Sequence, residues 1–239
     1  YWSSMFASAH MRKYGTTLED IAYVGAKNHR NAMDNPYAYF KKMYSIDDIM
    51  ESKPLTETLR LLDCSMPCNG AASVLLASDE IIKKFTDMPI WITGIGQKSI
   101  SAGFTKNDEL TSMTSTVKSS VDAYGMAGKK ANEVDVAELH DAFSVCEIIE
   151  LEDLGFTPKG LGSSYVRNLY DTNDKKINPR GGLIGSGHPL GATGIAQTIE
   201  IFQQLQGNAK KRQVDGAKTG LVHNMSAAST SSTVLILES

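Results

Sequence analysis

The sequence predicts an α/β protein in which helices cover a layered sheet. From residue 90 to the C-terminus, short apolar runs alternate with helical patterns, as they do in layered α/β folds. Before residue 88 the patterns are mainly helical, so a helical region should precede the sheet. Strands are expected at residues 90–95, 134–139, 218–224 and 233–238, and helices at residues 2–14, 18–32, 45–50, 79–86, 117–131, 143–154 and 195–205.

Local signals set the limits of the N-terminal helices. Gly15 should end the first helix, because glycine readily adopts the left-handed conformation of a C-cap. Thr16 or Thr17 is the expected N-cap of the second helix, with Glu19 as its capping-box partner. Asn35-Pro36 then breaks that helix.

The segment from residue 61 to residue 89 is less regular. Cys64 and Cys68 lie in a loop without further ligand pairs nearby, so we interpret both as structural. Residues 71–78 have the apolar run of a buried strand. Their pattern resembles that of residues 231–238, which suggests a faint internal repeat.

Composition excludes several classes of protein. A chain of 239 residues with 41% hydrophobic and 21% charged residues is typical of a globular protein with one large or two small domains. A net charge of −3 without a dense basic tract does not indicate nucleic-acid binding. The longest apolar runs, such as residues 234–237, are too short to span a membrane. Three cysteines favour a reducing, cytoplasmic location over a disulfide framework.

A glycine-rich loop over residues 178–194 carries the strongest chemical signal. It contains six glycines and His188, and it leads into the helix at 195–205, whose apolar residues are 195, 199, 202 and 205. A histidine held there could act as a base or as a donor to an oxyanion. It could equally be a structural histidine in a turn. The pattern is neither a dinucleotide fingerprint nor a phosphate P-loop.

Three motifs resemble those of one enzyme family. Residues 187–194 (GHPLGATG) resemble the GHPxGxxG loop of thiolases. Residues 140–143 (HDAF) and 223–228 (HNMSAA) are similar to two further loops of the sterol-carrier-protein type of thiolase and its archaeal and bacterial relatives. The resemblance extends to residues 27–31 and 61–64 and spans the whole chain.

The resemblance implies a thiolase fold, a layered α/β/α sheet with a helical loop region. Residues 1–87 would comprise the helical loop region and the end of the N-terminal half, and residues 88–239 the whole C-terminal domain. Because the chain starts at Tyr1 rather than at methionine, the nucleophilic cysteine of the family is expected upstream of it.

The resemblance also implies site residues. The residue matching His188 serves the nucleophilic cysteine and the oxyanion hole, and the one matching His140 donates to the same oxygen. The turn matching Met225 and Ser226 gives a backbone N–H to a second oxyanion hole, and Asn224 and Ser226 are counted with the two histidines as catalytic residues. No metal is implied. We interpret His223 as structural, and His10 and His29 as surface residues.

Binding of coenzyme A is expected at the glycine loop, through Gly187 and Gly191, and at the second helix. Lys27 and Arg30 lie on the polar face of that helix, where they could either meet phosphates or form an ordinary solvated face.

One departure from the family pattern concerns the base. Sterol-carrier-type thiolases have a cysteine in His-Asp-Cys-Phe, where this chain has Ala142, and the last loop also lacks a cysteine. Cys146 lies one helical turn further on, but a buried apolar helix would raise its pKa and make it a poor base.

Two functions therefore stay open. The first is an acyltransferase that catalyses Claisen condensation or thiolytic cleavage of 3-oxoacyl-CoA. The second is a thiolase-like protein without thiolysis, either a retro-aldolase for CoA thioesters or a non-catalytic acyl-CoA-binding or lipid-binding subunit. The resemblance implies a homodimer or tetramer, and a small acyl-CoA-binding partner with a zinc ribbon and an OB-fold.

Overall fold

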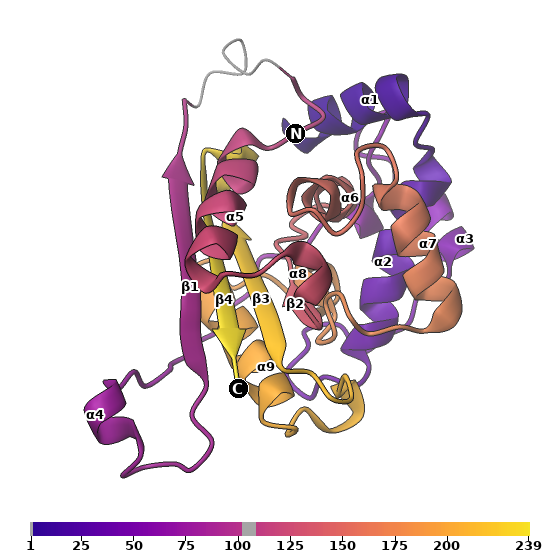
Figure 1. Ribbon diagram of the computed structural model, residues 1–239. Helices are drawn as coiled ribbons and strands as arrows, with labels where there is room; N and C mark the ends of the chain where they lie inside the picture. The colour runs from indigo at the N-terminus through magenta and orange to yellow at the C-terminus, as the bar shows by residue number, and fades with distance from the viewer. Residues whose placement is uncertain (1, 102–108) are drawn as a thin grey trace.

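A computed structural model describes residues 2–101 and 109–239, and its ordered core is a four-stranded mixed sheet (Figure 1). The strand order is β1-β4-β3-β2, in which β4 is antiparallel to both neighbours and β2 is parallel to β3. The strands are β1 (Trp91–Ser99), β2 (Val136–Glu138), β3 (Thr219–Met225) and β4 (Ser231–Glu238). All four correspond to strands that the sequence predicts.

Helices cover both faces of this sheet, which confirms the predicted α/β class. Helix α5 (Thr114–Ala127) packs on β1 and β4, and helix α9 (Thr193–Leu205) packs on β2 and β3 from the other side. Two strand glycines permit the close approach of α5, because a Cβ atom at Gly94 would lie 2.3 Å from the Ala123 carbonyl oxygen and one at Gly96 1.8 Å from that of Ser119.

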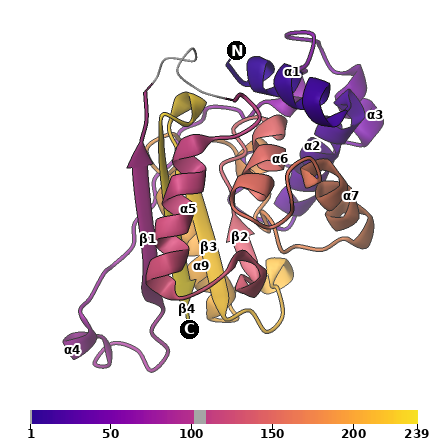
Figure 2. The ribbon, with the colours of Figure 1, turned by 45° about the horizontal axis from the view of Figure 1, so that its top comes forward.

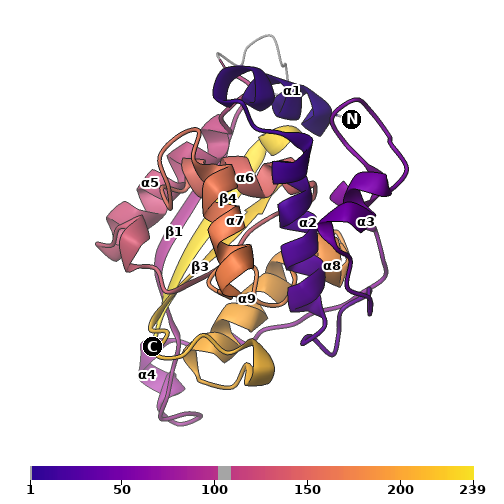
Figure 3. The same ribbon diagram turned by 90° about the vertical axis from the view of Figure 1, so that its right-hand side faces the viewer.

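A second group of helices lies beside the sheet (Figure 3). Helix α6 is fully buried, and α1, α2 and α7 pack around it. The helices of this group are α1 (Trp2–Tyr14), α2 (Leu18–Ala32), α3 (Ile46–Glu51), α6 (Ser144–Asp153), α7 (Gly162–Thr172) and α8 (Gly182–Ser186). Short 3-10 turns occur at Leu61–Asp63, Ala131–Glu133, Lys210–Arg212 and Ala227–Ser229.

The N-terminal helices begin and end where the sequence predicts. Thr17 is the N-cap of α2, but its capping-box partner is Asp20 rather than Glu19. Ser45 caps α3 in the same way. Tyr1 lies outside the described residues.

The strand expected at residues 71–78 is wrong. These residues pair with no described strand, and Leu75 and Leu76 are 89% and 73% exposed. The segment leads into α4 (Asp79–Ile82), which stands away from the rest of the molecule (Figures 1 and 2). An apolar run forms a strand only when a neighbouring strand completes its hydrogen bonds, and none of the described residues does so here. The faint internal repeat with residues 231–238 therefore has no counterpart in the sheet.

Two helices are absent from the sequence prediction. Helix α7 occupies the middle of residues 157–180, and α8 forms within the glycine loop itself. The start of α8 requires glycine for two reasons. Gly181 and Gly182 adopt left-handed conformations (φ +100° and +56°), and a side chain at either position would collide with Ala32 or Asp141.

The polar face predicted for α2 is buried, which corrects the interpretation of its residues. Lys27 is fully buried, with its Nζ atom 3.0 Å from Glu147 Oε1 and 2.6 Å from Asn28 Oδ1. His29 is also buried, as is His10 on α1, so neither is a surface residue. Packing of α2 against α6, α7 and α8 buries Lys27 and His29 on this face, while Arg30 stays partly exposed.

Within residues 2–101 and 109–239, no helix has the length and apolar character needed to cross a lipid bilayer.

Candidate active site

The ends of two strands and the glycine loop meet at a cavity of about 620 Å³. It contains all four residues that the sequence assigns to catalysis, namely His140, His188, Asn224 and Ser226. The rest of its wall is mostly apolar and includes Trp2, Leu55, Leu61, Cys64, Met66, Ala142, Phe143 and Leu190. Residues as far apart in the chain as Trp2 and Ala227 thus form one site.

His140 follows β2 and is held from two sides. Its backbone N–H donates to Glu150 Oε2 over 2.9 Å. On the ring, Nδ1 lies 2.9 Å from Asn224 Nδ2, and Asn224 in turn lies at the end of β3. Because β2 and β3 are parallel neighbours, their carboxyl ends bring these two side chains together.

His188 is held by the glycine loop and by the start of α9. Its backbone N–H donates to the Met66 carbonyl over 2.9 Å, and its Nδ1 atom lies 2.8 Å from Thr193 Oγ1. Gly187 precedes it with φ +87°, and a Cβ atom there would lie 2.8 Å from Cys68 Sγ. The loop therefore requires glycine at this position to pass the Cys68 segment.

The imidazole rings of His140 and His188 are in edge-to-face contact. Their centroids are 5.1 Å apart and their planes differ by 86°. Neither Nε2 atom has a hydrogen-bond partner among the described residues, and neither is sealed from solvent. Both are therefore available to a molecule in the cavity.

Burial keeps both rings neutral near pH 7. Desolvation, followed by the neighbouring His188, His223 and Arg180, lowers the pKa of His140 well below its usual 6.5. Desolvation, followed by the charge of Arg180, also lowers the pKa of His188. A neutral histidine offers one N–H and one lone pair, so each ring can serve as a donor or as a base according to which nitrogen carries the proton.

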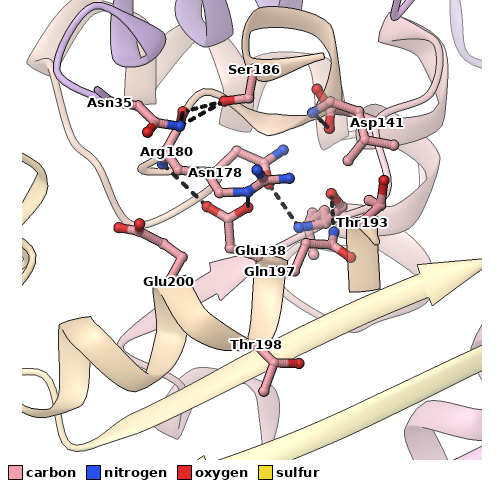
Figure 4. A network of polar contacts seen from close by, with 12 residues as sticks. Asn35, Glu138, Asp141, Asn178, Arg180, Ser186, Thr193, Gln197, Thr198 and Glu200 are labelled. Carbon is pink, nitrogen blue, oxygen red and sulfur yellow. Dashed lines mark hydrogen bonds and ion pairs between the residues drawn. The ribbon is translucent and has the colours of Figure 1, made fainter. Parts of the chain in front are cut away.

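Asp141 connects the two histidine regions of the cavity, which are the strand end that carries His140 and the glycine loop that carries His188. Its carboxyl oxygens accept hydrogen bonds from the backbone N–H groups of Leu183 (2.6 Å) and Ile184 (3.3 Å) at the start of α8, and from Asn28 Nδ2 (2.7 Å). Figure 4 shows Asp141 within the polar network at the inner side of the glycine loop. The residue next to His140 thus fixes the loop that carries His188.

The backbone N–H of Ser226 is not free to bind an oxyanion, as the resemblance to thiolases implies it should be. Its backbone N–H donates to the Ser231 carbonyl over 2.9 Å, in the hairpin between β3 and β4. That N–H is already used, so in this arrangement it cannot serve an oxyanion hole. Asn224 also uses both amide hydrogens, one toward His140 and one toward Gln197 Oε1 (2.9 Å), so it orients a neighbour and offers the cavity no N–H.

Neither cation assigned to coenzyme A lines the cavity. Lys27 is buried in its ion pair with Glu147. Arg30 donates to the Tyr170 carbonyl over 2.9 Å and stacks on the Tyr170 ring. Gly187 lines a separate cavity on the other side of the loop, and a Cβ atom at Gly191 would meet no atom within 4 Å. Among the described residues that line the catalytic cavity, none is lysine or arginine.

Burial raises the pKa of two thiols, Cys146 and Cys64, and so disfavours their reactive thiolate forms. Cys146 is fully buried, and burial followed by the charge of Glu150 raises its pKa well above 9, as the sequence predicts. Burial also raises the pKa of Cys64, on the cavity wall, to about 12. Within the described part of the chain, no group of three His, Cys, Asp or Glu side chains is arranged to hold a metal ion.

Thr193 and Gln197 are the functional residues that sequence reasoning missed. Both are fully buried on α9, whereas Phe202 on the expected apolar face is 41% exposed. The helix therefore turns a polar face inward, which corrects the stripe predicted from residues 195, 199, 202 and 205. The spacing of four between Thr193 and Gln197, directly after the histidine loop, was the available signal.

Comparison with known proteins identifies the family. A family model described as thiolase C-terminal domain-like matches residues 96–239. The chain belongs to the thiolase family.

Relatives within this family cover most of the chain. It is 40% identical over 224 residues to an acetyl-CoA acetyltransferase of Methanothermobacter thermautotrophicus, a match that covers 93% of this chain and 58% of the relative. It is 41% identical over 232 residues to sterol carrier protein 2 of Oryctolagus cuniculus, covering 92% and 42%. The chain thus spans about half the length of these thiolase relatives.

Two solved structures share the thiolase-like fold. One is an Ltp2-ChsH2(DUF35) aldolase, with a TM-score of 0.86 at 22% identity, covering all of this chain and 63% of that one. The other is a monomeric SCP2-thiolase-like protein of Mycobacterium smegmatis, with a TM-score of 0.70 at 14% identity, covering 99% and 51%.

Proposed function

We propose that the protein is a thiolase-like acyltransferase that acts on acyl-CoA thioesters, by Claisen condensation or by thiolytic cleavage of a 3-oxoacyl-CoA. The observation that supports this most is the pair of histidines whose Nε2 atoms both reach one largely apolar cavity. Attack on a thioester carbonyl places negative charge on its oxygen, and a preorganised N–H donor stabilises that charge.

The two histidines would have different roles. His140 would donate its Nε2–H to the thioester oxygen. His188 would accept a proton from the attacking thiol at its Nε2 atom. Burial raises the pKa of Cys64, the thiol on the cavity wall, so we propose that a different thiol acts as the nucleophile.

Intact mass after incubation with acetyl-CoA tests this proposal. The protein should gain one acetyl group, and His188→Asn should slow that gain because no base then activates the thiol. His29→Asn, which alters a buried histidine on α2 outside the cavity, should acetylate at the normal rate. Failure of the folded protein to form any acyl adduct would count against acyl transfer.

A second candidate, a retro-aldolase for 3-hydroxyacyl-CoA, is favoured by Ala142. Ala142 replaces the cysteine that would transfer the proton at the substrate α-carbon in acyl transfer, and a methyl group cannot do this. A retro-aldol step does not need that second thiol. His188 would remove the hydroxyl proton, the bond between the α and β carbons would break to release an aldehyde or ketone, and His140 would stabilise the thioester enolate until it is protonated.

Ala142→Cys discriminates between the two. If acyl transfer is the function, the added thiol should raise turnover, because general-base help is typically worth about 10²–10⁴-fold. If retro-aldol cleavage is the function, carbonyl release from a 3-hydroxyacyl-CoA should be seen in the unaltered protein, without a gain from Ala142→Cys. Binding of acyl-CoA without either reaction would indicate a binding subunit.

Coenzyme A enters this proposal as the thioester substrate rather than as a resident cofactor. We further propose a cytoplasmic protein that forms a homodimer or tetramer and associates with a small acyl-CoA-binding subunit of the zinc-ribbon and OB-fold type. The DUF35 component named in the aldolase structure supports such a partner. Size-exclusion chromatography with light scattering would test the oligomer, and a monomer mass would contradict it.

A further inference from the structure

Gln197 forms the far end of a chain of contacts that reaches His140. Its Nε2 atom donates to the Leu139 carbonyl over 2.8 Å and to the His223 carbonyl over 3.1 Å. Its Oε1 atom lies 2.9 Å from Asn224 Nδ2. The side chain is fully buried, so every polar atom in this chain needs a partner of the correct kind.

The two carbonyls fix the orientation of the Gln197 amide. A backbone carbonyl can only accept, so the group that faces Leu139 and His223 must be the NH₂ group. The opposite orientation would place Oε1 against two carbonyl oxygens and leave buried lone pairs facing each other. Gln197 Oε1 is therefore the atom that Asn224 meets.

The orientation of Asn224 follows from that of Gln197. Only its NH₂ group can satisfy an oxygen, so one hydrogen of Nδ2 goes to Gln197 Oε1. The second hydrogen then points at His140 Nδ1, 2.9 Å away. His140 Nδ1 must accept this hydrogen bond through its lone pair.

We infer that Gln197 is a positioning residue that, through Asn224, places the proton of neutral His140 on Nε2, where it faces the cavity. Because α9 supplies Gln197, the helix that follows the His188 loop also sets the donor character of the other histidine. The consequence for catalysis rests on the proposed function, whereas the tautomer itself does not.

Nuclear magnetic resonance of the ¹⁵N-histidine-labelled protein reads the tautomer directly. In the unaltered protein, long-range ¹H–¹⁵N spectra should show a protonated Nε2 and an unprotonated Nδ1 for His140, with the signal assigned by its loss in His140→Asn. A through-hydrogen-bond coupling between Asn224 Nδ2 and His140 Nδ1 in uniformly labelled protein should confirm the contact without any substitution of Gln197. A protonated Nδ1 at neutral pH would overturn the inference.

Gln197→Met tests whether Gln197 is the cause. Methionine fills a similar volume but neither donates nor accepts a strong hydrogen bond. The side-chain amide of Asn224 then becomes free to adopt the flipped orientation. The proportion of the Nδ1–H form should rise about tenfold, the change expected when one buried hydrogen bond no longer favours a single amide orientation.

Gln204→Met is the matched control. Gln204 lies seven residues further along the same helix, is 1% exposed, and also bridges its neighbours, through Arg212 and Val214. Its loss should lower stability to a similar extent without changing His140. An unchanged tautomer in a folded Gln197→Met protein, or an equal change in Gln204→Met, would overturn the inference. If Gln197→Met does not fold, the coupling measurement decides.

Discussion

The two histidine regions of the cavity are served by one face of α9, but in different ways. Thr193 and Gln197, four residues apart, both point toward the polar network of the loop, whereas Thr198 points away from it (Figure 4). Thr193 contacts His188 directly. Gln197 acts on His140 through Asn224.

The two histidines differ in whether the group that contacts Nδ1 can switch between donating and accepting a hydrogen bond. The amide chain behind His140 ends on two carbonyls, so only one arrangement of protons satisfies it. The Thr193 hydroxyl can donate to the Pro189 carbonyl (3.2 Å) while it accepts from His188 Nδ1–H, or it can turn and donate to Nδ1. A fixed proton suits an oxyanion donor, and an adjustable one suits a residue that takes up and returns a proton.

Asn224→Asp should abolish this difference and have the largest effect on activity. A carboxylate only accepts, so His140 would carry its proton on Nδ1 and present a lone pair to the thioester oxygen. Loss of one oxyanion donor costs roughly 10²–10³ in kcat. Steady-state kinetics with an acyl-CoA substrate would measure it. Asn168→Asp adds the same charge on the surface and should be neutral; an active Asn224→Asp enzyme would contradict the assigned role of His140.

Asp141→Ala should separate the two regions structurally. It leaves two backbone N–H groups of α8 and one hydrogen of the Asn28 amide without a partner, and each unpaired buried group costs about 1–3 kcal/mol. We expect a loss of about 3 kcal/mol, which corresponds to roughly 6–12 °C in Tm for a chain of this size. Calorimetry would measure this loss, with the exposed Asp171→Ala as the control. Equal melting temperatures would show that Asp141 does not anchor the loop.

Thr193→Val should weaken only the His188 side. It removes the partner of Nδ1 while it keeps the shape of the side chain, and a lost hydrogen bond of about 1 kcal/mol corresponds to a tenfold or smaller fall in kcat. Thr193→Ser should retain most activity because it keeps the hydroxyl. Thr198→Val, on the opposite side of the helix, should have no effect. A Thr193→Val enzyme with full activity would show that His188 needs no orienting group.

Titration by nuclear magnetic resonance should show the smallest difference between the regions. The pKa values of both histidines are lowered from 6.5 in the folded protein, and that of His140 falls further because it is more deeply buried beside His188, His223 and Arg180. On lowering the pH from 7, His188 should therefore take up a proton before His140 does. The reverse order would contradict the assigned environments.

These shifts also determine how stability depends on pH. Between the folded pKa of each ring and 6.5, the unfolded chain binds more protons than the folded one, so stability should fall as the pH drops below 6.5. Substituting either histidine with asparagine should make the dependence in that window less steep, and urea titrations at a series of pH values would measure the change.

Much of the fold and of the site could be predicted from the sequence. Strand and helix patterns depend on near neighbours, and for this reason the four strands of the sheet and the N-cap at Thr17 agree with the structure, although Asp20 rather than the predicted Glu19 completes the capping box. The motifs around His140, His188 and Asn224 identified residues that line one cavity, because strand ends and a glycine loop bring such residues together.

Only the tertiary structure decided which surfaces are buried and which hydrogen atoms are used. Residues 71–78 have the composition of a strand, but pairing requires a partner that none of the described residues supplies. Lys27 belongs to a polar face by sequence, yet packing of α2 buries it against Glu147. Ser226 occurs in the right motif, but the hairpin consumes its N–H. Gln197 has no motif of its own, and it matters because two distant carbonyls fix the direction of its amide. Sequence specifies which groups are present, whereas burial, pairing and proton placement depend on contacts between residues far apart in the chain.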